Sequence, residues 1–174
     1  FSWVMFDIYQ REQLLYNWQT VTFELAKKYD SVLILATQNN KIIITEEENP
    51  ASTWANRWLP WGRMDPWEVD PLSSAKRELL EETWLISDHR ELFTTYNTDH
   101  KLLYTKHVFI AKECKKIAEQ SLDGWEKIKL HYYSFDEFIT CVSDGHINLP
   151  QLENMVLRHR LNNTLATLKD RLWI

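Results

Sequence analysis

Three glutamates, Glu78, Glu81 and Glu82, lie within five residues of a segment with helical periodicity. At about 100° per residue, their side chains share one arc of the helix. The opposite arc holds Leu72, Ala75, Leu79, Leu80 and Thr83. Like charges three and four residues apart destabilise a helix, and Arg77 alone cannot neutralise three acids. Carboxylate oxygens crowded in this way are the ligands that Mg²⁺ or Mn²⁺ prefers. From the residues alone, a divalent-cation site and a solvated acidic face near Arg77 and Lys76 both remain open.

The helix that carries these acids has a clear start, because Asp70 can cap it and Pro71 suits its first position. We therefore predict a helix over 71–83, preceded by a proline-rich loop over 48–71. The other expected elements are strands at 4–10, 20–27, 31–37, 41–47, 102–113 and 126–134, a helix from Ser134 to Gly145, and an amphipathic helix over 150–172. Interspersed strands and helices predict an α/β (α+β) fold with a mixed sheet.

The segment also resembles a known motif. The Nudix hydrolases carry G-x5-E-x7-R-E-U-x-E-E-x-G-U, where U is bulky and apolar. Here Gly62 is followed after five residues by Glu68, and later by the run Arg77-Glu78-Leu79-Leu80-Glu81-Glu82. "LPWGR", "DPLSSAKRELLEET" and "LDGWEKIKLHYYSFDEF" are similar to other family segments, so the resemblance covers about 20–145. It implies a Nudix α/β/α sandwich.

The resemblance also implies an activity, namely Mg²⁺-dependent (or Mn²⁺-dependent) hydrolysis of the diphosphate in a nucleoside diphosphate linked to another group. Glu78, Glu81 and Glu82 would bind metal, and Arg77 would orient them. Gly62, Arg63 and Glu68 would contribute to substrate binding, with Glu68 as an auxiliary ligand or a partner of a metal-bound water. Glu126 is the candidate general base, and its alternative is a solvated acid at a strand end.

The chain departs from the family pattern at several positions. Eight residues separate Glu68 from Arg77 where the pattern has seven, so one residue, which we take to be Val69, is extra. Asn49 replaces an arginine that is usual in ADP-ribose hydrolases, which weakens that assignment.

Tryptophan also stands where the family has glycine. The sequence has only three glycines against nine tryptophans. Six tryptophans occupy family glycine positions or turn-like stretches: Trp18, Trp54, Trp61, Trp67, Trp84 and Trp125. Glycine after a helix commonly takes a left-handed conformation that a large residue resists. We interpret some of these tryptophans as replacements of parental glycines, and we expect Trp61, Trp67 and Trp84 to reduce activity.

Composition limits the partners. With 174 residues and a net charge of −5, the chain is the size of one domain and has no basic excess for nucleic acid or an anionic membrane. We expect a single Nudix domain over 1–174. The apolar runs are too short for a membrane helix, no signal-peptide pattern is present, and Cys114 and Cys141 lack metal-ligand spacing, so we expect buried thiols and a cytoplasmic protein.

The substrate class stays open at this point. Residues 1–28 are similar to the segment with which nucleotide-sugar hydrolases dimerise, which favours nucleotide sugars and a homodimer. A nucleoside triphosphate sanitising pyrophosphatase is the alternative within the enzyme class. A catalytically silent Nudix scaffold that binds nucleotide or protein is the alternative outside it. Trp58, Phe93 and Tyr104 are candidates for stacking on a base or for core packing.

Overall fold

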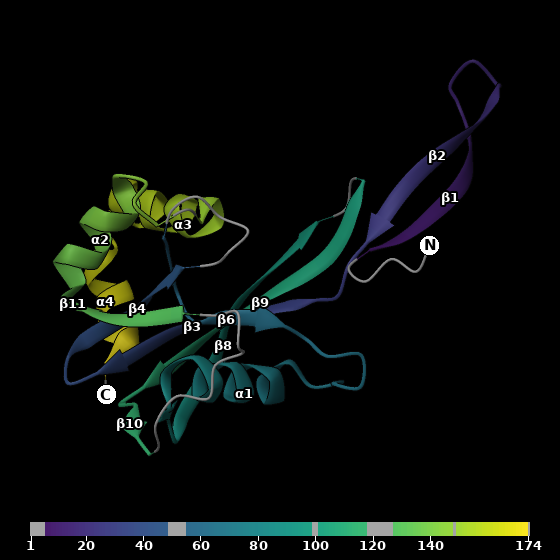
Figure 1. Ribbon diagram of the computed structural model, residues 1–174. Coiled ribbons are helices and arrows are strands. Elements are labelled where there is room, and N and C mark those ends of the chain that lie inside the picture. Colours follow the sequence, from purple (N-terminus) through teal and green to yellow (C-terminus); the bar gives the residue numbers. More distant parts are fainter. Residues whose placement is uncertain (1–5, 49–54, 99–100, 118–126, 148, 174) are drawn as a thin grey trace.

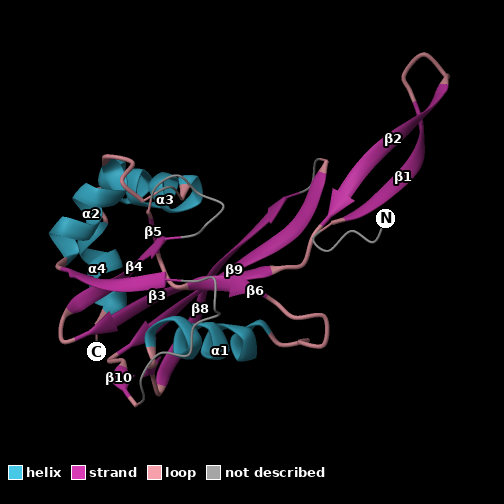
Figure 2. Cartoon of the chain, in the orientation of Figure 1, coloured by secondary structure: helices cyan, strands magenta, loops and turns pink. Residues whose placement is uncertain are grey.

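The computed structural model describes residues 6–48, 55–98, 101–117, 127–147 and 149–173 (Figures 1 and 2). Its strands are β1 (Asp7–Leu14), β2 (Thr20–Lys27), β3 (Ser31–Gln38), β4 (Lys41–Glu48), β5 (Asn56–Trp58), β6 (Trp61–Arg63), β7 (Leu85–Ile86), β8 (His89–Thr98), β9 (Leu102–Lys112), β10 (Lys115–Lys116) and β11 (Lys127–Tyr133). Its helices are α1 (Pro71–Thr83), α2 (Phe135–Ser143), α3 (Pro150–Leu161) and α4 (Leu165–Leu172).

A large mixed sheet forms the centre of the fold. Its main path runs β1-β2-β9-β3-β4-β11, while β5, β6 and β8 pair with β4, β3 and β9 respectively. Strand β9 is parallel to both β2 and β3, whereas β3 and β4 form an antiparallel hairpin. That hairpin turns at Asn39 and Asn40, both with positive φ, which asparagine tolerates better than most residues.

Helices cover both faces of the sheet, as Figure 1 shows. Even-numbered β3 residues such as Val32 and Ile34 join one core cluster with Ala75 and Leu79 of α1. Odd-numbered residues such as Leu33 join the other cluster, which holds the buried side chains of α2, α3 and α4. This alternation follows from the two-residue period of a strand, and it confirms the predicted fold class with a helix-covered mixed sheet.

Several local predictions were wrong. The segment predicted as loop contains β5 and β6, and β8 was not expected at all. The predicted helix over 150–172 is two helices, because the chain turns at Asn163, which has a φ of 54°. Tertiary pairing with β3, β4 and β9 accounts for the missed strands, whose own sequences alternate only weakly.

The β1–β2 hairpin projects away from the body (Figure 1). Strand β1 pairs only with β2 among the described strands, and β2 meets β9 through two residue pairs, Ala26↔Leu102 and Lys27↔Leu103. The large apolar side chains that it exposes are Ile8, Tyr9, Leu14, Tyr16, Trp18, Val21 and Phe23. The hairpin therefore carries an unpaired edge and an apolar surface.

Two further observations concern membrane-spanning helices and the two cysteines. Of the helices that the structure describes, none is both long and apolar enough to cross a membrane. Cys114 and Cys141 are free and buried, which confirms the expectation of buried thiols.

Candidate active site

The N-terminal end of α1 is capped as the sequence predicts. Asp70 has an extended backbone, and its carboxylate accepts hydrogen bonds from the backbone N–H groups of Leu72 and Ser73 at 3.1 and 3.2 Å. Pro71 occupies the first helical position, where a missing N–H costs nothing. This cap fixes where the helix begins, and so fixes which residues face the sheet.

Arg77 is the centre of the acidic cluster. Its Nε and Nη2 donate to the two carboxylate oxygens of Glu68 at 3.0 and 2.8 Å. Its Nη1 donates to Glu78 at 2.8 Å and to Glu81 at 3.0 Å, and Nη2 also reaches the backbone carbonyl of Arg63 at 3.1 Å. One planar guanidinium thus brings together three carboxylates from the loop and the helix.

Glu68 is held firmly although the loop before the helix is one residue longer than the family pattern. It receives the Asp65 N–H at 2.8 Å in addition to both Arg77 bonds. Arg77 is the largest influence holding the pKa of Glu68 down, to about 2. Val69, which we took to be the extra residue, has a 93% exposed side chain. The loop absorbs the insertion at its surface.

Glu78 lies against β6 with 13% of its side chain exposed. A Cβ at position 62 would lie 1.9 Å from the Glu78 carboxyl carbon, so the close approach of this side chain requires glycine at Gly62. Burial is the largest influence on Glu78 and raises the pKa of its carboxyl group to about 7, although Arg77 acts in the opposite direction. A carboxylate in this setting is stabilised by any further cation beside it.

Glu82 and Glu81 differ in their exposure. Glu82 is buried, and its carboxylate accepts the Trp61 backbone N–H at 3.1 Å. Glu81 lies one turn beyond Arg77, with 47% of its side chain exposed. Two of the three helix glutamates therefore face β6 and not solvent, which excludes a uniformly solvated acidic face.

The donor set fits a hard divalent cation in its chemistry, since Glu78, Glu81 and Glu82 offer only oxygen ligands. Glu78, largely but not fully buried and with a raised pKa, is the carboxylate that a cation would stabilise most. In the described part of the chain, no three His, Cys, Asp or Glu side chains stand close enough together to hold a metal as they are placed. Arg77 engages Glu78 and Glu81 in this arrangement, so a cation would have to share their remaining oxygens.

Comparison with known proteins identifies the family. The family model described as NUDIX domain matches residues 27–152. The chain belongs to the Nudix family. No curated protein matches it by sequence. A structure described as an ADP compounds hydrolase superposes with a TM-score of 0.73 at 14% identity, covering 93% of this chain and 89% of that one. A NUDIX hydrolase from Nitrosomonas europaea gives a TM-score of 0.59 at 20% identity, covering 78% and 90%.

Family membership makes the chain a Nudix hydrolase, an enzyme of phosphoric anhydride bonds. The Nudix motif maps onto the loop and helix just described, from Gly62 to Leu85. Arg63 of this motif is exposed, and its guanidinium lies 5.3 Å from the centre of the Tyr29 ring. Glu126 lies outside the described residues, so its role stays a prediction. Trp58 and Phe93 pack against the core cluster of the α2–α4 side.

The tryptophans at family glycine positions or in turn-like stretches fall into two groups. Trp84 follows α1 in the left-handed conformation, with φ 57° and ψ 23°, and Trp18 has a φ of 67° in the β1–β2 turn. Glycine would be unstrained at both positions. Trp61 and Trp67 do not have positive φ angles, so glycine is not needed there for backbone conformation. Trp54 and Trp125 lie outside the described residues.

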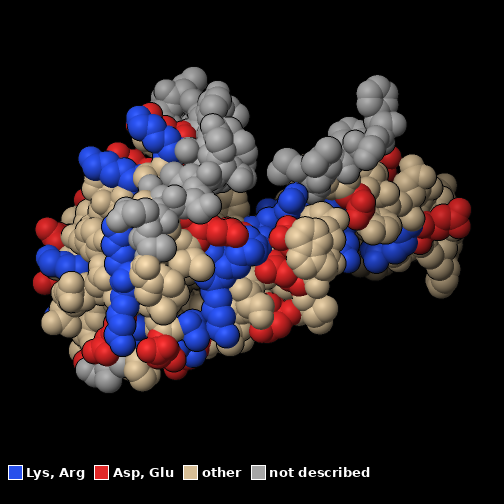
Figure 3. Space-filling model, turned by 60° about the horizontal axis from the view of Figure 1, so that its bottom comes forward, with Lys and Arg blue, Asp and Glu red and all other residues tan. Residues whose placement is uncertain are grey.

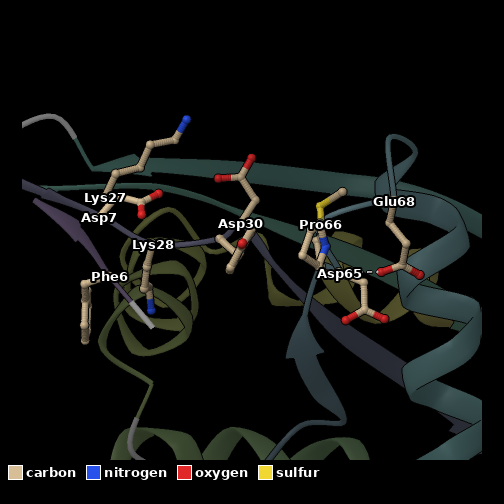
Figure 4. A pocket seen from close by; sticks show the side chains of 10 residues that line it. Phe6, Asp7, Lys27, Lys28, Asp30, Asp65, Pro66 and Glu68 are labelled. Atoms are coloured by element: carbon tan, nitrogen blue, oxygen red, sulfur yellow. Dashed lines mark hydrogen bonds between the residues drawn. The ribbon is translucent and has the colours of Figure 1, made fainter. Parts of the chain in front are cut away.

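Sequence reasoning missed three features of this site. Asp65 lies 3.9 Å from Arg77, and the Trp61 backbone N–H holds Glu82. A cavity of about 240 Å³ also opens beside the loop, with Glu68 on one wall and Lys28 on another (Figure 4). Only the position of Asp65 in the motif loop gave a signal for these features. A backbone donor and a cavity depend on the pairing of β6 with β3, which the sequence did not predict.

Proposed function

We propose that this Nudix hydrolase is a Mg²⁺-dependent pyrophosphohydrolase that cleaves the diphosphate of a nucleoside diphosphate linked to another group, with nucleotide sugars as the favoured class. The observation that carries the proposal is the placement of Glu78 and Glu82 against β6, beside an arginine that hydrogen-bonds the neighbouring acids. The negative charge of such an arrangement favours a divalent cation, which can also neutralise the charge of a bound diphosphate.

Glu78, Glu81 and Glu82 are the residues that would hold the metal, and Mn²⁺ is an acceptable substitute. When bound, the metal neutralises phosphate charge and lowers the pKa of a coordinated water. Arg77 orients Glu78 and Glu81, and the Trp61 N–H orients Glu82. Both Glu68 oxygens are engaged by Arg77, so we assign Glu68 to positioning. Gly62 and the exposed Arg63 would face the substrate phosphates, and Glu126 is the candidate base.

Two considerations support a nucleoside diphosphate compound over a nucleoside triphosphate. The similar structure with the greater coverage is described as an ADP compounds hydrolase. The chain also carries the N-terminal strands that resemble those of nucleotide-sugar hydrolases. Triphosphate sanitising remains the alternative activity. Charges of both signs are intermixed on the face shown in Figure 3, and we propose no nucleic-acid partner.

The test is a substrate panel of nucleotide sugars, dinucleotides and nucleoside triphosphates, with products separated by chromatography. We expect hydrolysis of the diphosphate compounds in Mg²⁺, none in chelator, and a loss of at least a hundredfold in Glu82→Gln. Equal rates for wild type and Glu82→Gln would reject the catalytic assignment and favour a silent scaffold.

We also propose that residues 1–174 form one Nudix domain that dimerises through the β1–β2 hairpin. The exposed edge of β1 and the apolar side chains Ile8 and Phe23 support this. Sedimentation of wild type and of an Ile8→Lys/Phe23→Lys variant tests it. A dimeric wild type and a monomeric variant are expected, whereas a monomeric wild type would reject the proposal. A cytoplasmic location remains a prediction.

A further inference from the structure

Two lysines lie on the face of the sheet opposite α1. Lys106 of β9 is in register with Ser31 of β3, and the alternate β9 residues Val108 and Ile110 belong to the core cluster of α2–α4. Tyr104 lies two residues before Lys106, so it shares that face. The Lys28 ammonium lies 3.9 Å from the centre of the Tyr104 ring, which brings the second lysine to the same place.

Neither lysine has a carboxylate partner among the residues that the structure describes. Burial lowers the pKa of Lys28. The pKa of Lys106 is also lowered, mainly by burial and to a smaller extent by the positive charge of Lys28. Asp30, which is close in sequence, faces elsewhere: its carboxylate accepts the Thr105 N–H at 2.7 Å, and in Figure 4 Lys28 points away from it. Within the described ranges, the pair is therefore partly desolvated positive charge without an ion-pair partner, although Asp7 and Asp30 line the same cavity as Lys28.

Ser31 adds a polar group to the same face. It is only 4% exposed, and its hydroxyl has no hydrogen-bond partner in the described part of the chain. Buried hydroxyl groups in folded proteins nearly always have a partner. An anion held by Lys106 would lie beside the Ser31 hydroxyl and accept its hydrogen bond.

The position is suited to a part of the substrate other than the cleaved diphosphate. Ser31 pairs with Lys106 on one side and with Arg63 of β6 on the other, so two strand spacings, about 10 Å, separate Lys106 from β6. The glutamates of α1 lie against β6 on the opposite face of the sheet. The cavity in Figure 4 has Glu68 and Lys28 among its lining residues, so Lys28 borders the space beside the motif loop.

We propose that Lys28, Lys106 and the Ser31 hydroxyl form an anion subsite that binds a phosphate or carboxylate group of the substrate, outside the diphosphate that is cleaved. This rests on the proposed function only in treating the ligand as the substrate. Lys28 and Lys106 are thus specificity-determining residues that select substrates with an additional negative charge.

Two matched pairs of compounds test the subsite and distinguish the two anions. UDP-glucuronate differs from UDP-glucose by a carboxylate, and NADP⁺ differs from NAD⁺ by a phosphate. Dissociation constants are measured by calorimetry without divalent cation, so binding is read independently of turnover. We expect wild type to bind the more charged member of at least one pair about tenfold more tightly or better, the effect of one charge-assisted hydrogen bond or more.

Three variants locate the effect. Lys106→Met should abolish the preference and leave the affinity for the less charged member within about twofold of wild type. Ser31→Ala should reduce the preference without lowering the melting temperature, because it removes a hydroxyl that has no partner in the folded chain. Lys129→Met, which removes an exposed lysine from β11, is the matched control and should keep the preference.

The outcomes separate this inference from the proposed function. Equal affinities within both pairs, an absence of binding, or an equal loss for both members in Lys106→Met would overturn the subsite. Hydrolysis in Mg²⁺ is measured on the same compounds. If the protein prefers the more charged member of a pair but hydrolyses no compound, the subsite is retained and the enzymatic proposal is rejected. If it hydrolyses the compounds without such a preference, the enzymatic proposal is retained and the subsite is rejected.

Discussion

The two ends of α1 differ in how completely their polar groups are paired. At the N-terminal end, Asp70 caps the helix, and Arg77 donates to Glu68, Glu78 and Glu81. At the C-terminal end, Trp84 takes a left-handed conformation, and its buried indole N–H has no partner among the described residues. Within the described helix, the last turn also carries no basic residue to offset the helix dipole.

This difference indicates that the acidic cluster needs its particular residues, whereas the fold tolerates a strained residue at the end of the helix. Each carboxylate that the Arg77 cluster brings together has a particular partner, and losing one would leave charge unpaired near the sheet. A left-handed tryptophan costs only about 1–2 kcal/mol, which a well-packed domain can absorb. The helix end can therefore carry a residue other than glycine, whereas the acidic cluster depends on the residues that form it.

The largest effect is expected from removing the centre of the cluster. Arg77→Met leaves Glu68, Glu78 and Glu81 without their shared cation, and we expect it to lower the free energy of unfolding by about 3 kcal/mol. Activity should fall about tenfold to a hundredfold, because Glu78 and Glu81, the metal ligands that we propose, lose their orienting partner. Denaturant unfolding and steady-state rates measure the two effects.

Arg171→Met is the control for this prediction. Arg171 pairs with Glu91 at 3.3 Å, and both side chains are nearly half exposed. We expect Arg171→Met to lower the free energy of unfolding by less than about 1 kcal/mol and to leave the steady-state rate unchanged. Similar effects of Arg77→Met and Arg171→Met on stability and rate would contradict the prediction that Arg77 contributes more than an exposed ion pair.

The second effect is a pH dependence at Glu78. Burial raises its pKa in the folded protein from 4.5 to about 7, so the stability gained from the neutral carboxyl is complete below pH 4.5 and is lost as the pH rises through 7. In metal-free protein, Glu78→Gln should therefore gain stability relative to wild type between pH 5 and 8, by roughly 3 kcal/mol at most.

Melting temperatures across this pH range test that prediction. Saturating Mg²⁺ should remove the advantage of the variant at pH 8, because the cation stabilises the ionised carboxylate. A difference between wild type and variant that does not change with pH would show that Glu78 titrates normally. Glu68 has the opposite sign: its lowered pKa stabilises the fold above pH 4.5, and this is lost as the pH falls towards 2.

The smallest effect is expected at the C-terminal end of α1. Trp84→Gly relieves a left-handed conformation and removes an N–H group without a described partner. We therefore expect the free energy of unfolding to rise by about 1 kcal/mol and the melting temperature by roughly 2–4 °C. Trp67→Gly is the matched control, because Trp67 is 75% exposed and lacks a positive φ. It should give no gain, and equal gains from both would contradict the conformational explanation.

The sequence predicted most of what depends on local chemistry. Asp70 and Pro71 located the start of α1, the two asparagines located the β3–β4 turn, and the expected strain at Trp84 is present as a positive φ. It did not predict β6, because a strand of three residues exists only through its pairing with β3. The burial of Glu78 and Glu82 follows from that pairing, so the helix pattern alone left a solvated acidic face open.

Lys28 and Lys106 were missed for a similar reason. They are far apart in the sequence, and nothing in either neighbourhood marks them. They meet because β9 runs parallel to both β2 and β3, a long-range arrangement that strand periodicity does not encode.

If the acids of α1 form a site for a divalent cation, direct metal binding detects it without knowledge of the substrate. Mn²⁺ is titrated into wild type, Glu82→Gln and the control Glu153→Gln, which changes an acid of α3, and free Mn²⁺ is followed by electron paramagnetic resonance. We expect binding by wild type and by Glu153→Gln, and an affinity at least about tenfold lower for Glu82→Gln. Equal affinities for all three proteins, or no binding by wild type, would contradict this expectation.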